Sequence, residues 1–391
     1  METGLITAYC ALGTMALIPI YYGSYGSLKT PKAVRLARKS AKKATKKDQE
    51  EEDWSSEEEE EESEAISSED AYWFPVVGSG ALFGLYLLFR YLNKEYVNYL
   101  LTAYFALVGV AALTKVGANT VAGLTGYREH GYHIRLTQRA KELFHLRFTR
   151  LHMASAVASV LGTAYYVLTK NWIMSNAFGM AFATSAISLI ELDSFKTGMI
   201  LLSGLFFYDI FWVFGTEVMV SVAKNFDAPI KVIFPRNLFA SKLQFTMLGL
   251  GDIVIPGIFL ALALRYDQHR ANLTTKTTSF PKPYFTATLI AYILGLSTTM
   301  VVMHVFQAAQ PALLYLSPAC IISVLLTAVV RGELSEVLSY TAEEKKPKDK
   351  KDNESSEEED EEEESANSTA TPKSSSSSKK RSGKKGKRTG Q

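Results

Sequence analysis

The chain of 391 residues is 47% hydrophobic and 21% charged, and these two classes of residue are segregated along the sequence. Charged residues concentrate in 29–70 and 342–391. Most of the remaining chain consists of apolar runs of about 20 residues, the length that spans a bilayer. This segregation excludes an ordinary soluble domain and predicts an all-α polytopic membrane protein. The formal net charge of +2 excludes little, because acidic and basic blocks cancel.

The apolar runs predict nine transmembrane helices. Their predicted ranges are 5–25, 74–92, 96–116, 151–169, 172–190, 198–219, 244–264, 284–307 and 311–330. The fourth has the weakest apolar pattern, since it is rich in Ala, Ser and Thr. We therefore divide the chain into a first span (1–28), a charged loop (29–73), spans two to five (74–192), spans six to nine with the candidate site (193–340) and a tail (341–391).

Lysine and arginine predict the orientation of these spans. Positive residues concentrate in the segments after the first, third, fifth and seventh spans and in the C-terminal tail. Because cytosolic loops carry the excess of positive charge, the C-terminus is expected in the cytosol and the N-terminus on the opposite side. The loop 220–243, with four positive residues, is the one segment that disagrees.

The charged loop and the tail have a composition typical of disorder. Residues 29–47 are basic and 50–70 are acidic, and the tail has an acidic block before its basic end. Such blocks bury too little apolar surface to fold, so we expect both segments to be disordered. A basic cluster beside a membrane can bind anionic lipids, although a solvated topology signal is the simpler interpretation. No aromatic residues interleave the basic end, so no nucleic-acid partner is expected.

The sequence predicts neither a metal site nor a cofactor. No cluster of His, Cys or carboxylate residues has metal-ligand spacing. The motifs of nucleotide-binding loops, serine hydrolases and zinc proteases are also missing from the sequence. The two cysteines, Cys10 and Cys320, both lie inside apolar runs and indicate no disulfide framework.

Two aspartates inside consecutive apolar spans are the strongest functional signal. A charged group at the bilayer centre costs at least about 2.5–3.5 kcal/mol, and such residues are usually functional. Asp209 lies about ten residues before the end of its predicted span and Asp252 about eight residues after the start of the next. At about 1.5 Å per residue the two depths are about 15 and 12 Å, so antiparallel neighbours can bring the carboxylates together. Gly249 and Gly251, on either side of Leu250, give the backbones room to approach.

Two adjacent carboxylates in a low dielectric share one proton, which supplies a base and an acid at once. This is the arrangement of an aspartic protease, in which one carboxylate activates water and the other protonates the peptide carbonyl. Tyr208 adds a hydroxyl, although its position on the helix turns it about 100° away from its neighbour.

A third element is the segment that begins at Gln310 and opens the last span. Pro311 is suited to a first helical turn and interrupts the helix before it. Unpaired backbone at membrane depth is tolerated only where protein or a water-filled cavity covers it. We therefore expect this segment to pair with an extended substrate.

The three motifs together resemble the intramembrane aspartyl proteases, the group that contains signal peptide peptidase and presenilin. The resemblance rests on Tyr-Asp in FFYDIFWVFGT, Gly-Leu-Gly-Asp in MLGLGDIVIPGIF and Pro-Ala-Leu in QPALLYL, and it covers residues 74–340. The segment VMVSVAKNFDAPIKVIFP resembles the signal peptide peptidase branch. The resemblance implies a presenilin-like fold with Asp209 and Asp252 as the catalytic pair. The residues that it implies for substrate binding or site shaping are Tyr208, Gly249, Leu250, Gly251, Gln310, Pro311, Ala312 and Leu313.

The resemblance also implies substrates and a location. Members cleave remnant signal peptides and type II-oriented membrane helices in the endoplasmic reticulum membrane, without a metal or cofactor. A lumenal N-terminus and a cytosolic C-terminus agree with that branch. Membrane lipids are expected partners, while a homo-oligomer and quality-control partners stay open. The tail lacks the terminal dilysine retrieval signal of some members, so the mode of retention stays open as well.

Two other functions remain open from the residues alone. Two buried carboxylates also suit a proton- or cation-coupled transporter, but such a protein should show two related halves, and we find none. A non-catalytic scaffold that binds membrane helices would not need the aspartates.

Overall fold

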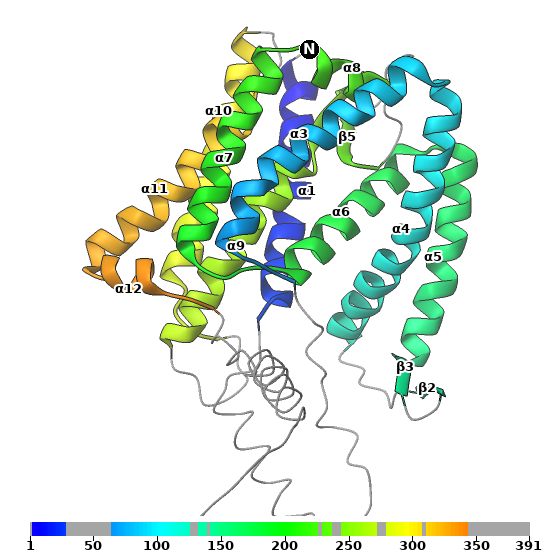
Figure 1. The fold of residues 1–391 in the computed structure, drawn as a ribbon, viewed down its shortest axis with the longest axis horizontal. Coiled ribbons are helices and arrows are strands. Elements are labelled where there is room, and N and C mark those ends of the chain that lie inside the picture. Colours follow the sequence, from blue (N-terminus) through cyan, green and yellow to red (C-terminus); the bar gives the residue numbers. More distant parts are fainter. Residues whose placement is uncertain are drawn as a thin grey trace, which may run out of the picture. The chain divides into compact units, whose positions relative to one another are not determined.

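The computed structural model describes residues 2–28, 64–125, 132–138, 141–225, 229–236, 244–271, 279–306 and 310–342. This part of the chain is built mainly from helices (Figure 1). The long helices are α1 (Glu2–Gly26), α3 (Ser68–Tyr91), α4 (Lys94–Thr125), α5 (Arg150–Thr169), α6 (Trp172–Leu189), α7 (Phe195–Phe214), α9 (Gly251–Arg270), α10 (Pro283–Phe306) and α11 (Leu313–Arg331). Two short helices are α8 (Val218–Asn225) and α12 (Leu334–Ser339).

Each predicted span overlaps one long helix, including the weak fourth span, which forms α5. The predicted all-α membrane class is therefore confirmed. Seven of these helices are long and apolar enough to cross a membrane, and α6 and α9 are not among them. The number nine thus stays a prediction.

Three short two-stranded pairs were not expected from the sequence. Strand β1 (Glu64–Ile66) pairs in parallel with β4 (Ile190–Leu192). Two antiparallel pairs join β2 (Tyr132–Gln138) to β3 (Lys141–Phe148) and β5 (Lys231–Pro235) to β6 (Phe245–Gly249). The β5–β6 pair replaces the beginning of the predicted seventh span, so a helix from residue 244 was wrong. The segment up to Gly249 is extended instead.

Other predicted boundaries also shift. The charged loop was expected to be disordered up to residue 73, but β1 and the first residues of α3 occupy its last part. Ser67 and Asp70 form a reciprocal capping box that begins α3 at Ser68. Helix α7 ends at Phe214 rather than at residue 219. The rest of the predicted disorder, in 29–63 and 343–391, lies outside the described residues.

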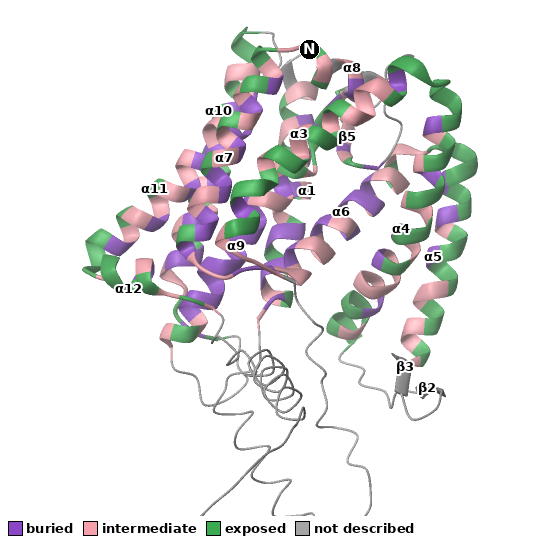
Figure 2. Cartoon of the chain, in the orientation of Figure 1, coloured by how far each residue is buried: buried purple, intermediate pink, exposed green. Residues whose placement is uncertain are grey.

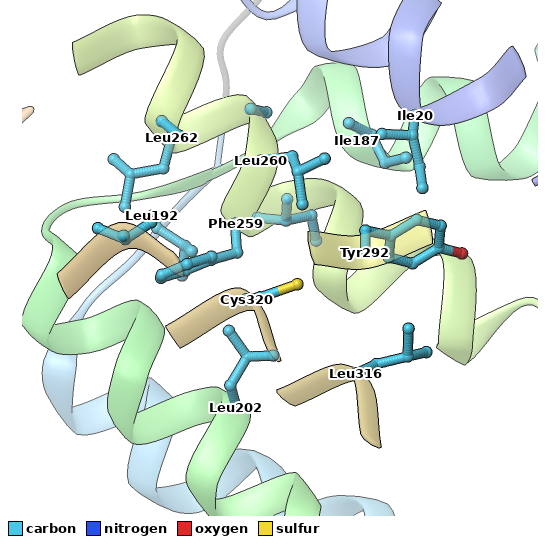
Figure 3. Packing of buried hydrophobic residues seen from close by; sticks show 14 of the residues in the cluster. Ile20, Ile187, Leu192, Leu202, Phe259, Leu260, Leu262, Tyr292, Leu316 and Cys320 are labelled. Atoms are coloured by element: carbon cyan, nitrogen blue, oxygen red, sulfur yellow. The ribbon is translucent and has the colours of Figure 1, made fainter. Parts of the chain in front are cut away.

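Helix α9 is the most enclosed helix of the described part. Its residues from Ile258 to Leu264 are at most 1% exposed. Figure 3 shows side chains from α1, α6, α7, α10 and α11 around Phe259 and Leu260. By contrast, α4 and α5 lie side by side and carry many exposed apolar residues, as expected of helices that face lipid (Figure 2). Protein rather than lipid therefore surrounds the helix that carries Asp252.

Charged side chains fix the end of α9 that is farther from Asp252. Arg265 forms a buried ion pair with Glu191 of β4, with 2.9 Å between nitrogen and oxygen. The carboxylate of Asp267 accepts hydrogen bonds from the backbone N–H groups of Tyr284 and Phe285 at 3.3 and 2.9 Å. Since these N–H groups belong to the first turn of α10, Asp267 satisfies donors that have no partner within their own helix.

Gly198 lets α7 approach α9 closely. A Cβ atom at this position would lie 2.6 Å from Cδ2 of Phe259 and 3.1 Å from Cδ1 of Leu192. We predict that Gly198→Ala lowers the free energy of unfolding by about 1–3 kcal/mol, because the surrounding buried side chains must move. Thermal unfolding of the purified protein in detergent measures this change. Gly80→Ala, in α3 with open space around the new methyl group, is the matched control and should not destabilise.

Candidate functional site

Asp209 lies on α7 and is buried, with 5% of its surface exposed. Its Oδ2 atom accepts a hydrogen bond of 3.0 Å from the backbone N–H of Leu313. Leu313 is the first residue of α11, and the N-cap residue before it, Ala312, has no polar side chain to accept such a bond. Asp209 therefore caps α11 from a different helix.

The Pro-Ala-Leu segment is buried at all three positions, and Gln310 beside it is half-buried. The helix begins only at Leu313, so the prediction that Pro311 lies in the first helical turn was wrong. Pro311 precedes the N-cap residue instead. The segment thus leads into α11 beside Asp209. Its first helical N–H group, that of Leu313, donates to Asp209.

Asp252 is the second residue of α9 and is half-buried. A Cβ atom added to Gly249 would lie 3.3 Å from Oδ2 of Asp252, so glycine keeps the space beside the carboxylate open. A Cβ atom added to Gly251 would have no neighbouring atom within 4 Å. Leu250 turns the other way, since its Cδ2 atom lies 3.5 Å from the position of a Cβ on Gly179 of α6.

The structure changes the predicted depths of the two aspartates. Asp209 precedes the end of α7 by five residues, and Asp252 lies in the first turn of α9. The predicted depths of ten and eight residues were therefore too large. The aspartates still occupy the facing ends of two helices that pack together.

Tyr208 lies on a different side of α7 from Asp209. A Cβ atom on Gly78 of α3 would lie 3.8 Å from the Tyr208 ring. The ring also packs against Trp212, with 6.3 Å between centroids. Tyr208 thus supports α7 from the side of α3, whereas Asp209 is directed toward α11.

Each of the two carboxylates lies at the N-terminus of a helix. Asp209 accepts the N–H group at the start of α11, and Asp252 lies in the first turn of α9, where no side chain caps the helix. The positive end of a helix favours a nearby negative charge by about 0.3–1 kcal/mol. This arrangement offsets part of the cost of placing carboxylates at membrane depth.

Strand β6, which leads directly into the Gly-Leu-Gly-Asp motif, was not predicted from the sequence. Its burial alternates, with Thr246 and Leu248 buried and Met247 and Gly249 exposed. Alternation with a period of two is the signal of a half-buried strand. That signal was present in FTMLG but was hidden by the long apolar run that follows.

The hydrogen bond between Asp209 and Leu313 generates a prediction about stability. Asp209→Ala leaves the buried N–H of Leu313 without its acceptor, so we expect a loss of about 1–2 kcal/mol in the free energy of unfolding. Asp209→Asn retains an amide oxygen at the same place and should lose less. Thermal unfolding in detergent compares the two variants. Equal stability of both would show that the cap contributes nothing.

Comparisons with known proteins show which family the chain resembles. A family model described as signal peptide peptidase matches residues 58–344. The signal peptide peptidases of Mus musculus and Homo sapiens are each 41% identical to this chain over 356 residues, covering 88% of this chain and 85% and 86% of the relatives. A solved structure of a presenilin family intramembrane aspartate protease has a TM-score of 0.43 and 13% sequence identity, and covers 82% of this chain and 99% of that chain.

The family model spans most of the chain, and the mouse and human relatives match it over most of their own lengths. The chain therefore belongs to the signal peptide peptidase family.

Proposed function

We propose that Asp209 and Asp252 are the catalytic pair of this intramembrane aspartic endopeptidase. The observation that carries the proposal is the hydrogen bond from Leu313 to Asp209. It connects two motifs that lie 104 residues apart, while Asp252 of the third motif lies in the first turn of α9, which packs against α7. That the three segments lie on helices that pack together supports the proposal.

The pair acts as one unit that holds a single proton. The ionised carboxylate takes a proton from water while the water oxygen forms a bond to the peptide carbonyl carbon. The protonated carboxyl group gives its proton to the carbonyl oxygen, which produces a tetrahedral diol. When the C–N bond breaks, the departing amine receives a proton and the pair again shares one proton. Every proton in this cycle is therefore carried by the two carboxylates, the water and the substrate.

A peptide bond inside a helix is shielded and hydrogen-bonded, so the substrate must be locally extended before cleavage. We expected the Pro-Ala-Leu segment to pair with it. The N–H of Leu313 is already bonded to Asp209, so that group does not pair with a substrate. Strand β6 ends at Gly249, next to Asp252, and within the described residues it pairs only with β5. We therefore assign the pairing edge to β6, in the manner of a strand added to a sheet.

The substrates and location follow from the relatives. The mouse and human proteins are named signal peptide peptidases, which supports transmembrane helices such as remnant signal peptides as substrates of this chain. We place the chain in the endoplasmic reticulum membrane as a multi-pass protein. The distribution of Lys and Arg supports a lumenal N-terminus and a cytosolic C-terminus.

Cleavage of a signal-peptide-like helix by the purified protein tests the catalytic pair. We predict that Asp209→Asn and Asp252→Asn each lower the cleavage rate by at least about 1,000-fold, since neither variant can share a proton between two carboxylates. The Asp209→Asn variant is the more informative of the two. It keeps an acceptor for the N–H of Leu313, so a loss of activity reports on the chemistry and not on the capping of α11. Cleavage at the wild-type rate by either variant would refute the proposal. Substrate binding without cleavage by the wild-type protein would favour a scaffold.

The shared proton also predicts the dependence of the rate on pH. Activity requires one proton on the pair, so the rate should fall at high pH, where the pair loses it, and again at low pH, where both carboxylates are protonated. The measurement is kcat against pH in detergent or nanodiscs, with folding monitored in parallel. A rate that stays constant up to about pH 10 would contradict the mechanism.

A further inference from the structure

One face of α6 packs against the β5–β6 hairpin that leads to Asp252. The ring of Trp172 packs against Phe234 of β5, with 5.8 Å between centroids. Gly179 leaves room for Leu250, as described above, and for Val232 of β5, whose Cγ2 atom would lie 3.6 Å from an added Cβ. Trp172, Asn176 and Gly179 follow the spacing i, i+4, i+7, which places them on one face of the helix.

Asn176 occupies the centre of this face and pairs with the hairpin through both ends of its amide. Its Nδ2 atom donates to the carbonyl oxygen of Ile233 at 2.7 Å, and its Oδ1 atom accepts from the N–H of Ile233 at 2.8 Å. The side chain is 3% exposed. The amide of Asn176 therefore reproduces the pair of bonds that a neighbouring strand would make.

The register of the hairpin shows which edge this contact closes. The bonds from Leu250 to Ile230 and from Arg236 to Gln244 show that even-numbered residues of β5 bond toward β6. The backbone groups of Ile233 therefore point away from β6, because directions alternate along a strand. This is the edge that Asn176 covers.

By the same alternation, Phe245, Met247 and Gly249 of β6 direct their backbone groups to the opposite edge. Ile233 lies opposite Met247 in the register. Within the described residues no third strand pairs with β6. Met247 is 52% exposed and Gly249 is exposed as well. In the part of the chain that the structure describes, the central residue of the β5 edge, Ile233, is thus paired by Asn176, and no strand pairs with the β6 edge beside Asp252.

We infer that Asn176 is a positioning residue for cleavage, which closes the β5 edge and directs an extended substrate to β6. The inference rests on the proposed function of the chain. The amide of Asn176 acts in two ways. It fixes the hairpin, and hence the Gly-Leu-Gly-Asp segment, against α6. It also occupies the only backbone groups of Ile233 to which a substrate strand could pair on the wrong side. The bond that is cleaved is therefore set by the pairing of the substrate with Met247 and Gly249.

The test measures where the substrate is cut as well as how fast. We compare wild type, Asn176→Ala and Asn176→Gln on one signal-peptide-like helix and map the products by mass spectrometry. A hydroxyl-containing transition-state analogue titrates the competent sites, so that kcat is expressed for each intact site. For Asn176→Ala we expect kcat to fall about tenfold, as for a lost buried hydrogen bond, and the products to spread over neighbouring bonds. Asn176→Gln keeps the amide and should restore most of the wild-type product pattern.

Thr184→Ala is the matched control in the same helix. The hydroxyl of Thr184 donates to the carbonyl of Met180 within α6, so its loss leaves the hairpin untouched. This variant should cut at the wild-type bonds. If Asn176→Ala also cuts at the wild-type bonds with the wild-type kcat for each competent site, the inference is overturned.

A second variant approaches the same contact from the strand. Ile233→Pro removes the N–H group that donates to Oδ1 of Asn176. The bonds between β5 and β6 remain, because proline is tolerated on a strand where its missing N–H is not part of the ladder. It should reproduce the spread of products. If neither variant yields titratable sites while Thr184→Ala does, Asn176 has a purely structural role and the inference fails. The proposed function fails separately, if the Asp209→Asn or Asp252→Asn protein cleaves like the wild type.

Discussion

The constraint on which this structure depends is that a membrane offers no water to backbone groups or carboxylates left without a partner. The bond between Asp209 and the N–H of Leu313 resolves two such problems together. The carboxylate needs a donor, and the helix α11 needs an acceptor at its first turn, because Ala312 cannot provide one. An uncompensated group of either kind would cost several kcal/mol in hydrocarbon. This mutual need places the Pro-Ala-Leu segment at the first aspartate.

The same solution recurs elsewhere in the described part of the chain. Asp267 of α9 accepts the N–H groups of the first turn of α10. Asn176 of α6 pairs with both backbone groups of Ile233 in β5. In each case a side chain of one element satisfies the backbone of another. Such contacts fix elements relative to one another in a way that apolar packing alone does not, because hydrogen bonds have a direction.

The enclosure of α9 complements these polar contacts. Among the described residues, α1, α6, α7, α10 and α11 pack against it, and Gly198 and Gly257 allow side chains of neighbouring elements to approach closely. Protein therefore surrounds the helix that carries Asp252. Its far end is held by the ion pair of Arg265 with Glu191. The end at Asp252 remains half-buried and adjoins the edge of β6 to which we assign the substrate.

The sequence by itself determined the membrane class, the positions of the long helices and the two aspartates as the unusual residues. These features are local: an apolar run of about 20 residues is sufficient for a helix in a membrane, and a carboxylate inside it is conspicuous. The capping box of Ser67 and Asp70 and the alternation in FTMLG were equally local, but adjoining stronger patterns concealed them.

Only the tertiary structure decided how these parts meet. The cap of α11 joins residues 104 apart in the chain, and the contact of Asn176 with Ile233 joins residues 57 apart. Neither pairing leaves a periodic signal, since each depends on which helices pack together. The direction of Tyr208 toward α3 and the start of α11 at Leu313 were decided in the same way. The physical reason is that backbone groups at helix ends and strand edges accept any suitable partner, and packing alone determines which side chain is near enough to bind.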